Sequence, residues 1–353
     1  MSWLDRALAE LSSALGADAH VWRTEVGKDG RLVLHVATPE GLRWFAHDER
    51  ALVELSPRDE RELPGLAAFL RDEPAARIVA WRPGRRLVAR VVRGGRAHAV
   101  KLLRRRQAAR ALELHAAARA SADGLFHVPA AEVAHWPEAF QLDWLDAAEE
   151  LDFRRHADRF APFGAALARW QSGSAPAGLP MHARATELDV LDRWAERYAR
   201  AAAVLPEGFA AARQALGECA ARSVAVESSV VAHRDLHDGQ ILWTPGGPAL
   251  LDFDLLSIAE PELDLANLAE HCVLCGWQRA RGADADRAAR AADALIEGYR
   301  AQRAVDLQAL AFYRAATALR LALVHGLRPR SFHLRAPLVE RAHVLLAAPL
   351  EPR

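Results

Sequence analysis

Lysine is almost absent from this chain of 353 residues. Only Lys28 and Lys101 occur, all the other basic residues are arginine, and Asn267 is the only asparagine. Such a bias is typical of a GC-rich coding sequence. Because the broad guanidinium of arginine and the compact ammonium of lysine are not interchangeable, the lysine retained in the strand-like stretch Ala99-Val100-Lys101 is a candidate functional residue.

Cysteine and long apolar segments are also scarce. The three cysteines Cys219, Cys272 and Cys275 leave one thiol unpaired, which argues against a disulfide scaffold and favours a reducing compartment. No apolar run approaches the ~18 residues of a membrane span, and the first ten residues lack the basic-then-apolar order of a signal peptide. We therefore expect a cytoplasmic protein with no membrane partner.

The chain has no excess charge of either sign, since 46 basic residues balance 46 acidic ones. This balance argues against a nucleic-acid partner. The distribution is uneven, however: residues 81–110 carry eleven basic residues and no acid, and residues 251–270 carry six acids and no base. Most such runs are solvated faces, but this pair can also hold a phosphate ester and its metal ion.

Hydrophobic residues make up 51% and charged residues 26%, as in ordinary globular proteins of about two domains. The spacing of apolar residues predicts a sheet-rich first part and a mostly helical part from about residue 148. We expect helices over 1–15, 63–70 and 105–119 and strands over 20–26, 31–37, 42–46, 77–81, 87–92, 97–103, 128–133, 139–142, 230–232, 241–243 and 249–251.

A polar constellation flanks the last two of these strands, which form a hairpin. His233-Arg234-Asp235 and Gln240 precede it, and Asp252-Phe253-Asp254 follows it. If the strands pair symmetrically about Gly246, Gln240 faces Asp252. Amide and carboxylate oxygens are ligands that Mg²⁺ takes in proteins, and Asp235 then remains free to orient and deprotonate a hydroxyl group.

These segments resemble the catalytic and metal-binding segments of protein-kinase-like enzymes, specifically the aminoglycoside phosphotransferase and choline kinase branch. The resemblance covers roughly residues 76–330. It implies an α+β, bilobal protein-kinase-like fold, with a small antiparallel-sheet N-lobe over 76–146 and a helical C-lobe over 147–353. Residues 1–75 lie outside it and are expected to form an added N-terminal α/β subdomain.

The resemblance also implies a role for each matching residue. Asp235 would be the catalytic base, Gln240 and Asp252 would hold Mg²⁺, and Lys101 would bind the phosphates of ATP or GTP and pair with Glu113. Asp264 would brace the catalytic loop, with His233 anchoring it and Asp254 beside it. Gly84 would lie in the loop over the phosphates, and Asp143 and Leu145 in the hinge that holds the nucleotide base.

Three departures from the family pattern stand out. Arg234 replaces the usual glycine, Gln240 replaces the usual asparagine, and the phosphate-covering loop has a single glycine. The acidic run that contains Glu149, Glu150 and Asp152 is either a solvated face or a site for a cationic substrate. Cys272 and Cys275 lack a second ligand pair at zinc spacing and are interpreted as reduced core thiols.

The expected function is ATP-dependent transfer of the γ-phosphoryl group to a hydroxyl of a small molecule. An aminoglycoside, a sugar, an amino alcohol or a related metabolite would fit equally, and the oligomeric state stays open. The alternative from another class is a catalytically weak, nucleotide-binding pseudokinase that acts as a regulatory module. A haloacid-dehalogenase-type phosphatase is rejected, because no lysine follows Asp252.

Overall fold

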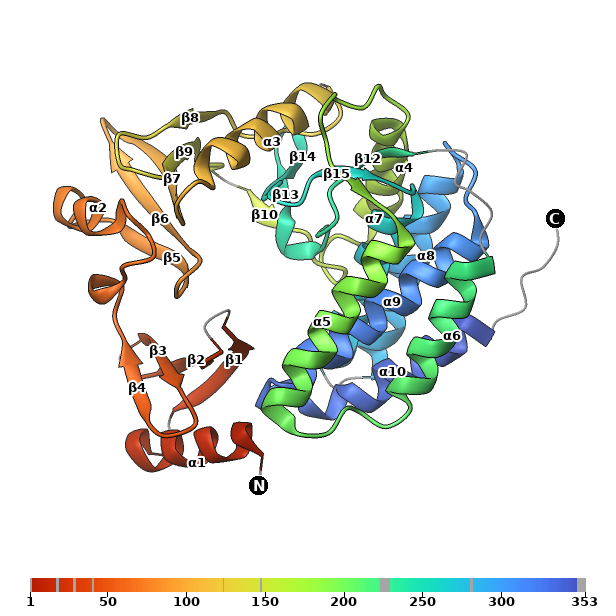
Figure 1. Cartoon of the computed structure of the whole chain (residues 1–353). Helices are drawn as coiled ribbons and strands as arrows, with labels where there is room; N and C mark the ends of the chain where they lie inside the picture. Colours follow the sequence, from red (N-terminus) through yellow and green to blue (C-terminus); the bar gives the residue numbers. More distant parts are fainter. Residues whose placement is uncertain are drawn as a thin grey trace.

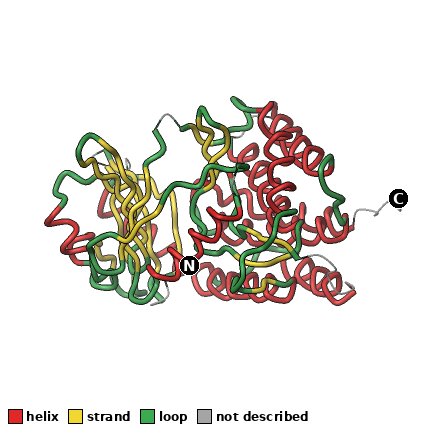
Figure 2. Tube along the Cα trace, turned by 90° about the horizontal axis from the view of Figure 1, so that it is seen from above, coloured by secondary structure: helices red, strands yellow, loops and turns green. Residues whose placement is uncertain are grey.

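The computed structural model describes residues 2–16, 19–27, 30–39, 41–122, 124–146, 148–222, 229–279 and 282–347. Two antiparallel sheets occupy the first 143 residues, and a helical region follows (Figure 1). Seen from above, the strands of both sheets gather on one side of the molecule and most helices on the other (Figure 2). This arrangement agrees with the predicted α+β class.

The chain begins with a helix and a four-stranded antiparallel sheet. Leu4 and Leu11 lie on the buried face of the helix, and Ser2 caps it by accepting a hydrogen bond from the N–H of Asp5 at 3.1 Å. The strands pair in chain order. The elements are α1 (Trp3–Leu15), β1 (His20–Val26), β2 (Leu32–Thr38), β3 (Gly41–His47) and β4 (Leu52–Leu55). The sequence predicts β1 to β3 within one residue but not β4, whose four residues are all partly or fully exposed.

The second sheet has five strands in the order β5-β6-β7-β9-β8, with every neighbouring pair antiparallel. Leu87, Ala89 and Val91 alternate along β6 and are buried. The elements of this part are η1 (Pro57–Asp59), α2 (Leu66–Asp72), β5 (Arg77–Arg82), β6 (Arg86–Arg93), β7 (Arg96–Leu103), α3 (Ala108–Ser121), β8 (Ala131–Val133) and β9 (Ala139–Asp143).

Helix α2 packs with this second sheet, although the sequence analysis assigns it to the N-terminal segment. Leu66 and Phe69 share a buried cluster with Trp81, Leu87 and Trp136. The edge of the Phe69 ring meets the Trp136 ring with centroids 4.9 Å apart. The apolar face of α2 therefore covers part of the five-stranded sheet.

The remaining chain is mainly helical and contains two small three-stranded sheets, β10-β13-β14 and β11-β15-β12. Its elements are β10 (Glu149–Glu150), η2 (Ala157–Arg159), α4 (Phe160–Gln171), β11 (Met181–His182), α5 (Arg184–Ala202), α6 (Phe209–Arg222), β12 (Val230–Ala232), η3 (Asp238–Gln240), β13 (Ile241–Thr244), β14 (Gly247–Leu250), β15 (Ser257–Ala259), α7 (Glu262–Gln278), α8 (Gly282–Arg300), α9 (Leu307–Gly326), η4 (Pro329–Leu334) and α10 (Arg335–Ala347).

The N-terminal sheet docks onto the helical region as well as preceding the second sheet in the chain. Trp3, Leu4 and Leu11 belong to the same buried cluster as residues of α5 and α9. The guanidinium of Arg200, on α5, lies 5.6 Å from the centre of the Trp3 ring. The first sheet therefore contacts both parts of the molecule (Figure 1).

Helix α9 is the one described helix long and apolar enough to cross a membrane. It has 20 residues and a mean hydropathy of 1.2, but 67% of its apolar window is buried inside the protein. Its neighbours include α5, α7 and α10. A buried core helix meets the same criteria, so this is weak evidence for a membrane span.

Candidate active site

The loop after β12 carries Asp235, and α7 holds the loop in place. The carboxylate of Asp264, in the first turn of α7, accepts hydrogen bonds from the backbone N–H groups of His233 and Arg234, both at 2.7 Å. Asp264 is fully buried. Burial raises its pKa, while His233 and the two N–H donors favour the charged form. The structure thus places Asp264 where the resemblance requires the bracing residue.

His233 links the same loop to the strand end that carries Asp252. Its Nδ1 accepts a hydrogen bond from the N–H of Asp235 at 3.3 Å, so Nε2 carries the proton and donates to the carbonyl of Leu251 at 2.8 Å. The His233 ring is buried, 5.1 Å from the Phe253 ring. His233 is therefore a buried anchor of the loop.

Two residues of the site adopt the left-handed backbone conformation without being glycine. Arg234 has φ 69° and Asp252 has φ 63°. This region costs a residue with a Cβ atom roughly 1–2 kcal/mol. Burial lowers the pKa of Arg234, and no hydrogen-bond partner for its Nε lies among the described residues. The conformation explains why glycine suits this position in the resembling enzymes.

Four charged side chains meet opposite the loop. Lys101 Nζ lies 2.9 Å from Asp252 Oδ1 and 2.6 Å from Asp254 Oδ1. Arg86 Nη2 lies 2.8 Å from Asp252 Oδ2, and Arg86 Nη1 lies 3.1 Å from Asp254 Oδ2. Strands β6 and β7 supply the cations, and the segment after β14 supplies the carboxylates.

The two cations determine the protonation of Asp252. Burial alone would raise its pKa, but Lys101 and Arg86 outweigh burial and hold the pKa well below its usual range. Burial likewise opposes the charge of Arg86, yet Asp252 and Asp254 raise its pKa. The charge of Asp235 also raises it, which places Asp235 within the same field. The cluster is therefore fully ionised at neutral pH.

Glu113 is not the partner of Lys101, contrary to the expectation from the resemblance. Its side chain is 64% exposed and pairs with Arg110 at 3.1 Å, within α3. The buried face of α3 includes Leu114 and His115 instead, and the His115 ring lies 5.6 Å from the Phe253 ring. Asp254 takes the place that Glu113 was expected to fill.

The hairpin register also differs from the expected one. Ile241 faces Leu250 and Thr244 faces Gly247, so the turn contains only two residues and is not centred on Gly246. The N–H of Leu251 donates to the carbonyl of Gln240 at 3.0 Å. Gln240 therefore faces Leu251, one position short of Asp252.

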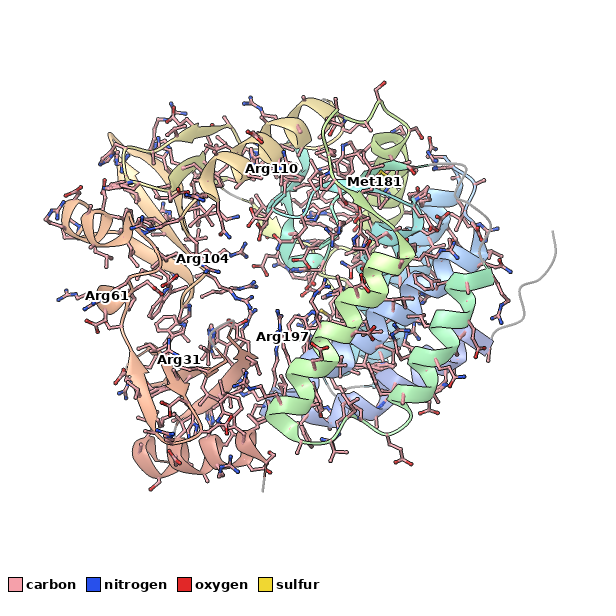
Figure 3. All side chains as sticks on the ribbon, in the orientation of Figure 1. Arg31, Arg61, Arg104, Arg110, Met181 and Arg197 are labelled. Carbon is pink, nitrogen blue, oxygen red and sulfur yellow. The ribbon has the colours of Figure 1, made fainter. Side chains whose placement is uncertain are left out.

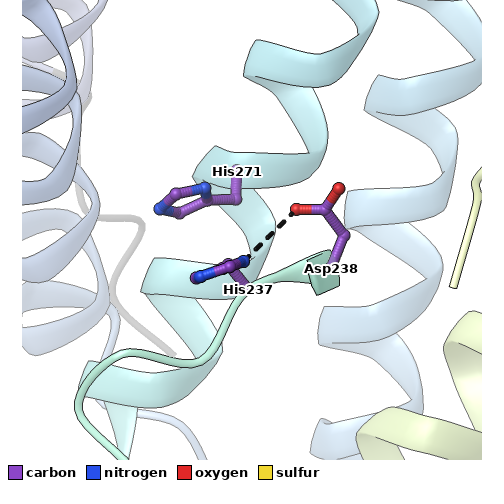
Figure 4. A group of neighbouring side chains, drawn as sticks. All are labelled: His237, Asp238 and His271. Carbon is purple, nitrogen blue, oxygen red and sulfur yellow. Dashed lines mark ion pairs between the residues drawn. The ribbon is translucent and has the colours of Figure 1, made fainter. Parts of the chain in front are cut away.

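The side chain of Gln240 belongs to a polar group at the turn η3. Its Nε2 lies 3.4 Å from His237 Nε2, and the His237 ring stacks on the His271 ring at 5.0 Å. Figure 4 shows these rings beside Asp238, whose Oδ1 lies 3.7 Å from His237 Nδ1. His237 Nδ1 also accepts the N–H of Gly239 at 3.1 Å. These contacts fix the turn that carries Gln240.

The remaining predicted nucleotide contacts lie along the two edges of the sheet-rich part. Gly84 occupies the turn between β5 and β6 with φ +66°, and its N–H donates to Glu60 Oε2 at 2.6 Å. Asp143 ends β9, and Leu145 follows it on the segment that leads to the helical region. Their contact with a nucleotide stays a prediction.

Sequence reasoning missed Arg86 and His115. Arg86 belongs to a run of basic residues in which no single arginine stands out, and only the pairing of β6 with β7 brings it to Asp252. His115 lies on a helix without a recognisable motif. The acidic run, in contrast, is divided: Glu149 pairs with His156 at 3.0 Å, whereas Asp152 lies 3.2 Å from Arg279.

The two cysteines of α7 are free thiols, as interpreted. Cys272 Sγ donates to the carbonyl of Ala288 at 3.3 Å, and Cys275 Sγ donates to Asp238 Oδ2 at 3.4 Å. Burial, followed by the charge of Asp238, raises the pKa of Cys272 to about 12 and that of Cys275 further. Both thiols are protonated at neutral pH and take no part in the charged cluster.

Comparison with known proteins agrees with this site. The model of the phosphotransferase enzyme family matches residues 13–313. No curated protein sequence matches the chain. A choline/ethanolamine kinase family protein from Mesorhizobium loti superposes with a TM-score of 0.55 at 15% identity, covering 83% of this chain and 94% of that one.

Two further solved structures share the fold. A glucosamine kinase in complex with glucosamine, ADP and inorganic phosphate has a TM-score of 0.52 at 17% identity and covers 94% of both chains. An amicoumacin kinase in complex with AMP-PNP and Ca²⁺ has a TM-score of 0.57 at 12% identity, covering 78% of this chain and 92% of that one. The protein-kinase-like fold predicted from the sequence is confirmed, and the chain belongs to the phosphotransferase enzyme family.

Proposed function

We propose that the protein transfers the γ-phosphoryl group of ATP or GTP to a hydroxyl group of a small molecule. The observation that carries this proposal is the ionised cluster of Lys101, Asp252 and Asp254 beside the Asp235 loop. A phosphoryl donor needs both a cation for its phosphates and carboxylates for its metal ion. Both lie here within one hydrogen-bond length of each other.

The carboxylates of Asp252 and Asp254 suit Mg²⁺, which prefers oxygen ligands. Gln240 lies one strand position from Asp252 and can add an amide oxygen after a change of rotamer. When bound, Mg²⁺ would neutralise the charge that develops on the transferred phosphoryl group. Lys101 would then be released from its carboxylates to contact the donor phosphates.

Asp235 is suited to orient the acceptor and to take its proton. Its loop is held from two sides, by Asp264 on α7 and by the contact of His233 with Leu251. A fixed base within hydrogen-bond reach of a hydroxyl contributes typically 10²–10⁴-fold to a rate. No step beyond this proton transfer is required of the protein, because positioning and electrostatics supply the rest.

A small-molecule acceptor is supported by the names of the similar structures, which are kinases of choline or ethanolamine, glucosamine and amicoumacin. At identities of 12–17% the likeness extends to the fold and not to the substrate. A cytoplasmic location, where ATP is available, is consistent with the three free thiols and is part of this proposal.

The proposal is tested by thermal-shift titration with ATP, GTP and ADP, with and without Mg²⁺. Asp252→Asn keeps the shape of the side chain but removes its charge, and Asp286→Asn on the exposed side of α8 is the matched control. We expect Mg²⁺-dependent stabilisation of the wild type and the control that is lost in Asp252→Asn.

Equal stabilisation of all three proteins would contradict the assigned site. Nucleotide binding without Mg²⁺ dependence, together with no ADP release across a panel of hydroxyl compounds, would instead favour the pseudokinase alternative.

A further inference from the structure

A cavity of about 490 Å³ adjoins the charged cluster, and seven of its thirteen lining residues are arginine. Its one acidic lining residue is Asp254. The turn between β5 and β6 forms one wall, the beginning of α3 a second, and Arg197 on α5 the opposite side. Figure 3 shows Arg104 and Arg110 on the sheet-rich side and Arg197 on α5, facing the space between the two parts, whereas Arg61 lies at the outer edge.

The positive charge of this arginine pocket is largely unbalanced. Arg86 is taken by Asp252 and Asp254, Arg104 lies 3.7 Å from Glu62, and Arg110 pairs with Glu113. Within the part of the chain that the structure describes, no carboxylate lies within ion-pair distance of four other lining residues. These are Arg82, Arg85, Arg106 and Arg197.

The arginines of the pocket also repel one another. Burial, then the charges of Arg23 and Arg86, lower the pKa of Arg82 to about 10. Burial, then Arg85 across the gap between the two parts, lowers the pKa of Arg197. The nearest carboxylate outside the cluster is that of Glu25, which is itself held by Arg23 at 3.3 Å and His35 at 3.7 Å. Like charges held together without partners oppose folding, and an anion between them would remove this cost.

The position of the pocket distinguishes it from the place of the donor phosphates. Lys101 does not line the cavity, and Arg197 and Arg106 belong to elements that carry no nucleotide residue. Asp254 forms part of its wall, so a molecule in the pocket would lie next to the metal-binding carboxylates. The transferred group would meet its acceptor on that side.

We propose that the acceptor of this enzyme carries an acidic group, a phosphate or a carboxylate, which the arginine pocket binds while its hydroxyl group faces Asp235. This inference rests on the proposed phosphotransferase function. Arginine binds such groups through two parallel hydrogen bonds. Because Arg85 and Arg197 come from the two sides of the gap, one anion would draw the sides together.

The test is a thermal-shift titration with the donor site filled by Mg²⁺ and AMP-PNP. The probes are inorganic phosphate and glucose 6-phosphate, compared with glucose and with sodium chloride at equal ionic strength. The double variant Arg106→Gln/Arg197→Gln removes one charge from each side of the pocket. Arg61→Gln, at an exposed position outside it, is the control.

We expect the phosphate-bearing probes to stabilise the wild type and Arg61→Gln, with glucose and chloride having no effect. In the double variant the probe concentration for half of the shift should rise at least tenfold. Without any probe, the double variant should be as stable as the wild type or more stable, because two mutually repelled charges are gone. A lower stability would show that these arginines have structural partners and would overturn the proposal.

Two other results would overturn it as well. One is the absence of any anion-dependent shift in the wild type, and the other is a shift that disappears once AMP-PNP occupies its site, which would assign the arginines to the donor phosphates. Stabilisation by Mg²⁺ and AMP-PNP in the same experiment reports on the proposed function separately. Its absence would contradict the phosphotransferase site, whatever the pocket binds.

Discussion

At the scale of single residues, the site depends on a short loop with an unusual backbone. Asp235 follows a residue in the left-handed region, and both its neighbours on the N-terminal side are tied to Asp264. The loop therefore fixes the direction of the Asp235 side chain through main-chain contacts. Chemistry and backbone geometry are separable here, and each can be tested by its own substitution.

Asp235→Asn keeps the size of the side chain and removes its ability to accept a proton. We expect kcat to fall by roughly 10²–10⁴-fold while the affinity for nucleotide stays within about twofold. ADP release with an identified acceptor and a nucleotide titration measure the two quantities. Asp286→Asn serves as the control, and a variant that keeps most of its turnover would exclude Asp235 as the base.

Arg234 tests the cost of the left-handed backbone. Arg234→Gly should be more stable than Arg234→Ala by about 1 kcal/mol, because alanine keeps the Cβ that this conformation disfavours. The same two substitutions at Arg193, in the middle of α5, should give the opposite order, since glycine weakens a helix by about 1 kcal/mol. Urea denaturation of the four variants measures both differences. Equal stability of the two Arg234 variants would contradict the strain.

At the scale of elements, the sequence predicted which segments meet but not how they pair. The motif residues after β12 and β14 are close in the chain, so their spacing alone placed them near one another. The register of β13 on β14 depended on a two-residue turn, and the rotation of α3 depended on which of its faces packs on the sheet. Arg86 reaches Asp252 only through strand pairing, which no local pattern contains.

The rotation of α3 gives a prediction about the partner of Lys101. Asp254→Asn should weaken Mg²⁺-dependent nucleotide binding, because Asp254 Oδ1 lies 2.6 Å from Lys101 Nζ. Glu113→Gln should leave it unchanged, since the Glu113 side chain is exposed and pairs with Arg110. Isothermal titration with Mg²⁺ and AMP-PNP distinguishes the two. Lost binding in Glu113→Gln alone would restore the pairing expected from the family.

At the scale of the whole molecule, the N-terminal sheet is the part that the sequence explained least. Its strands were predicted, but its docking was not, because apolar faces of similar composition do not reveal which surface they cover. The structure shows Trp3 at its contact with the helical region, 4% exposed, with its Nε1 donating to His47 Nδ1 at 2.8 Å.

Trp3 therefore tests whether this docking stabilises the protein. Trp3→Ala should lower the free energy of unfolding by about 3–5 kcal/mol, as expected for a buried tryptophan. Trp22→Ala, in the same sheet but with the side chain 41% exposed, should cost much less. Denaturant unfolding curves of the two variants and the wild type provide the measurement. Similar losses in both variants would contradict a stabilising role for the docked face.

The double attachment of the first sheet has a mechanical consequence. The five-stranded sheet is joined to the helical region by the chain after Asp143, and a second time through the docked N-terminal sheet. Two bodies fixed at two separate points keep a single easy rotation, about the line through both points. Opening to admit substrates would then resemble a door on a pair of hinges, and cutting either attachment would free the other directions of motion.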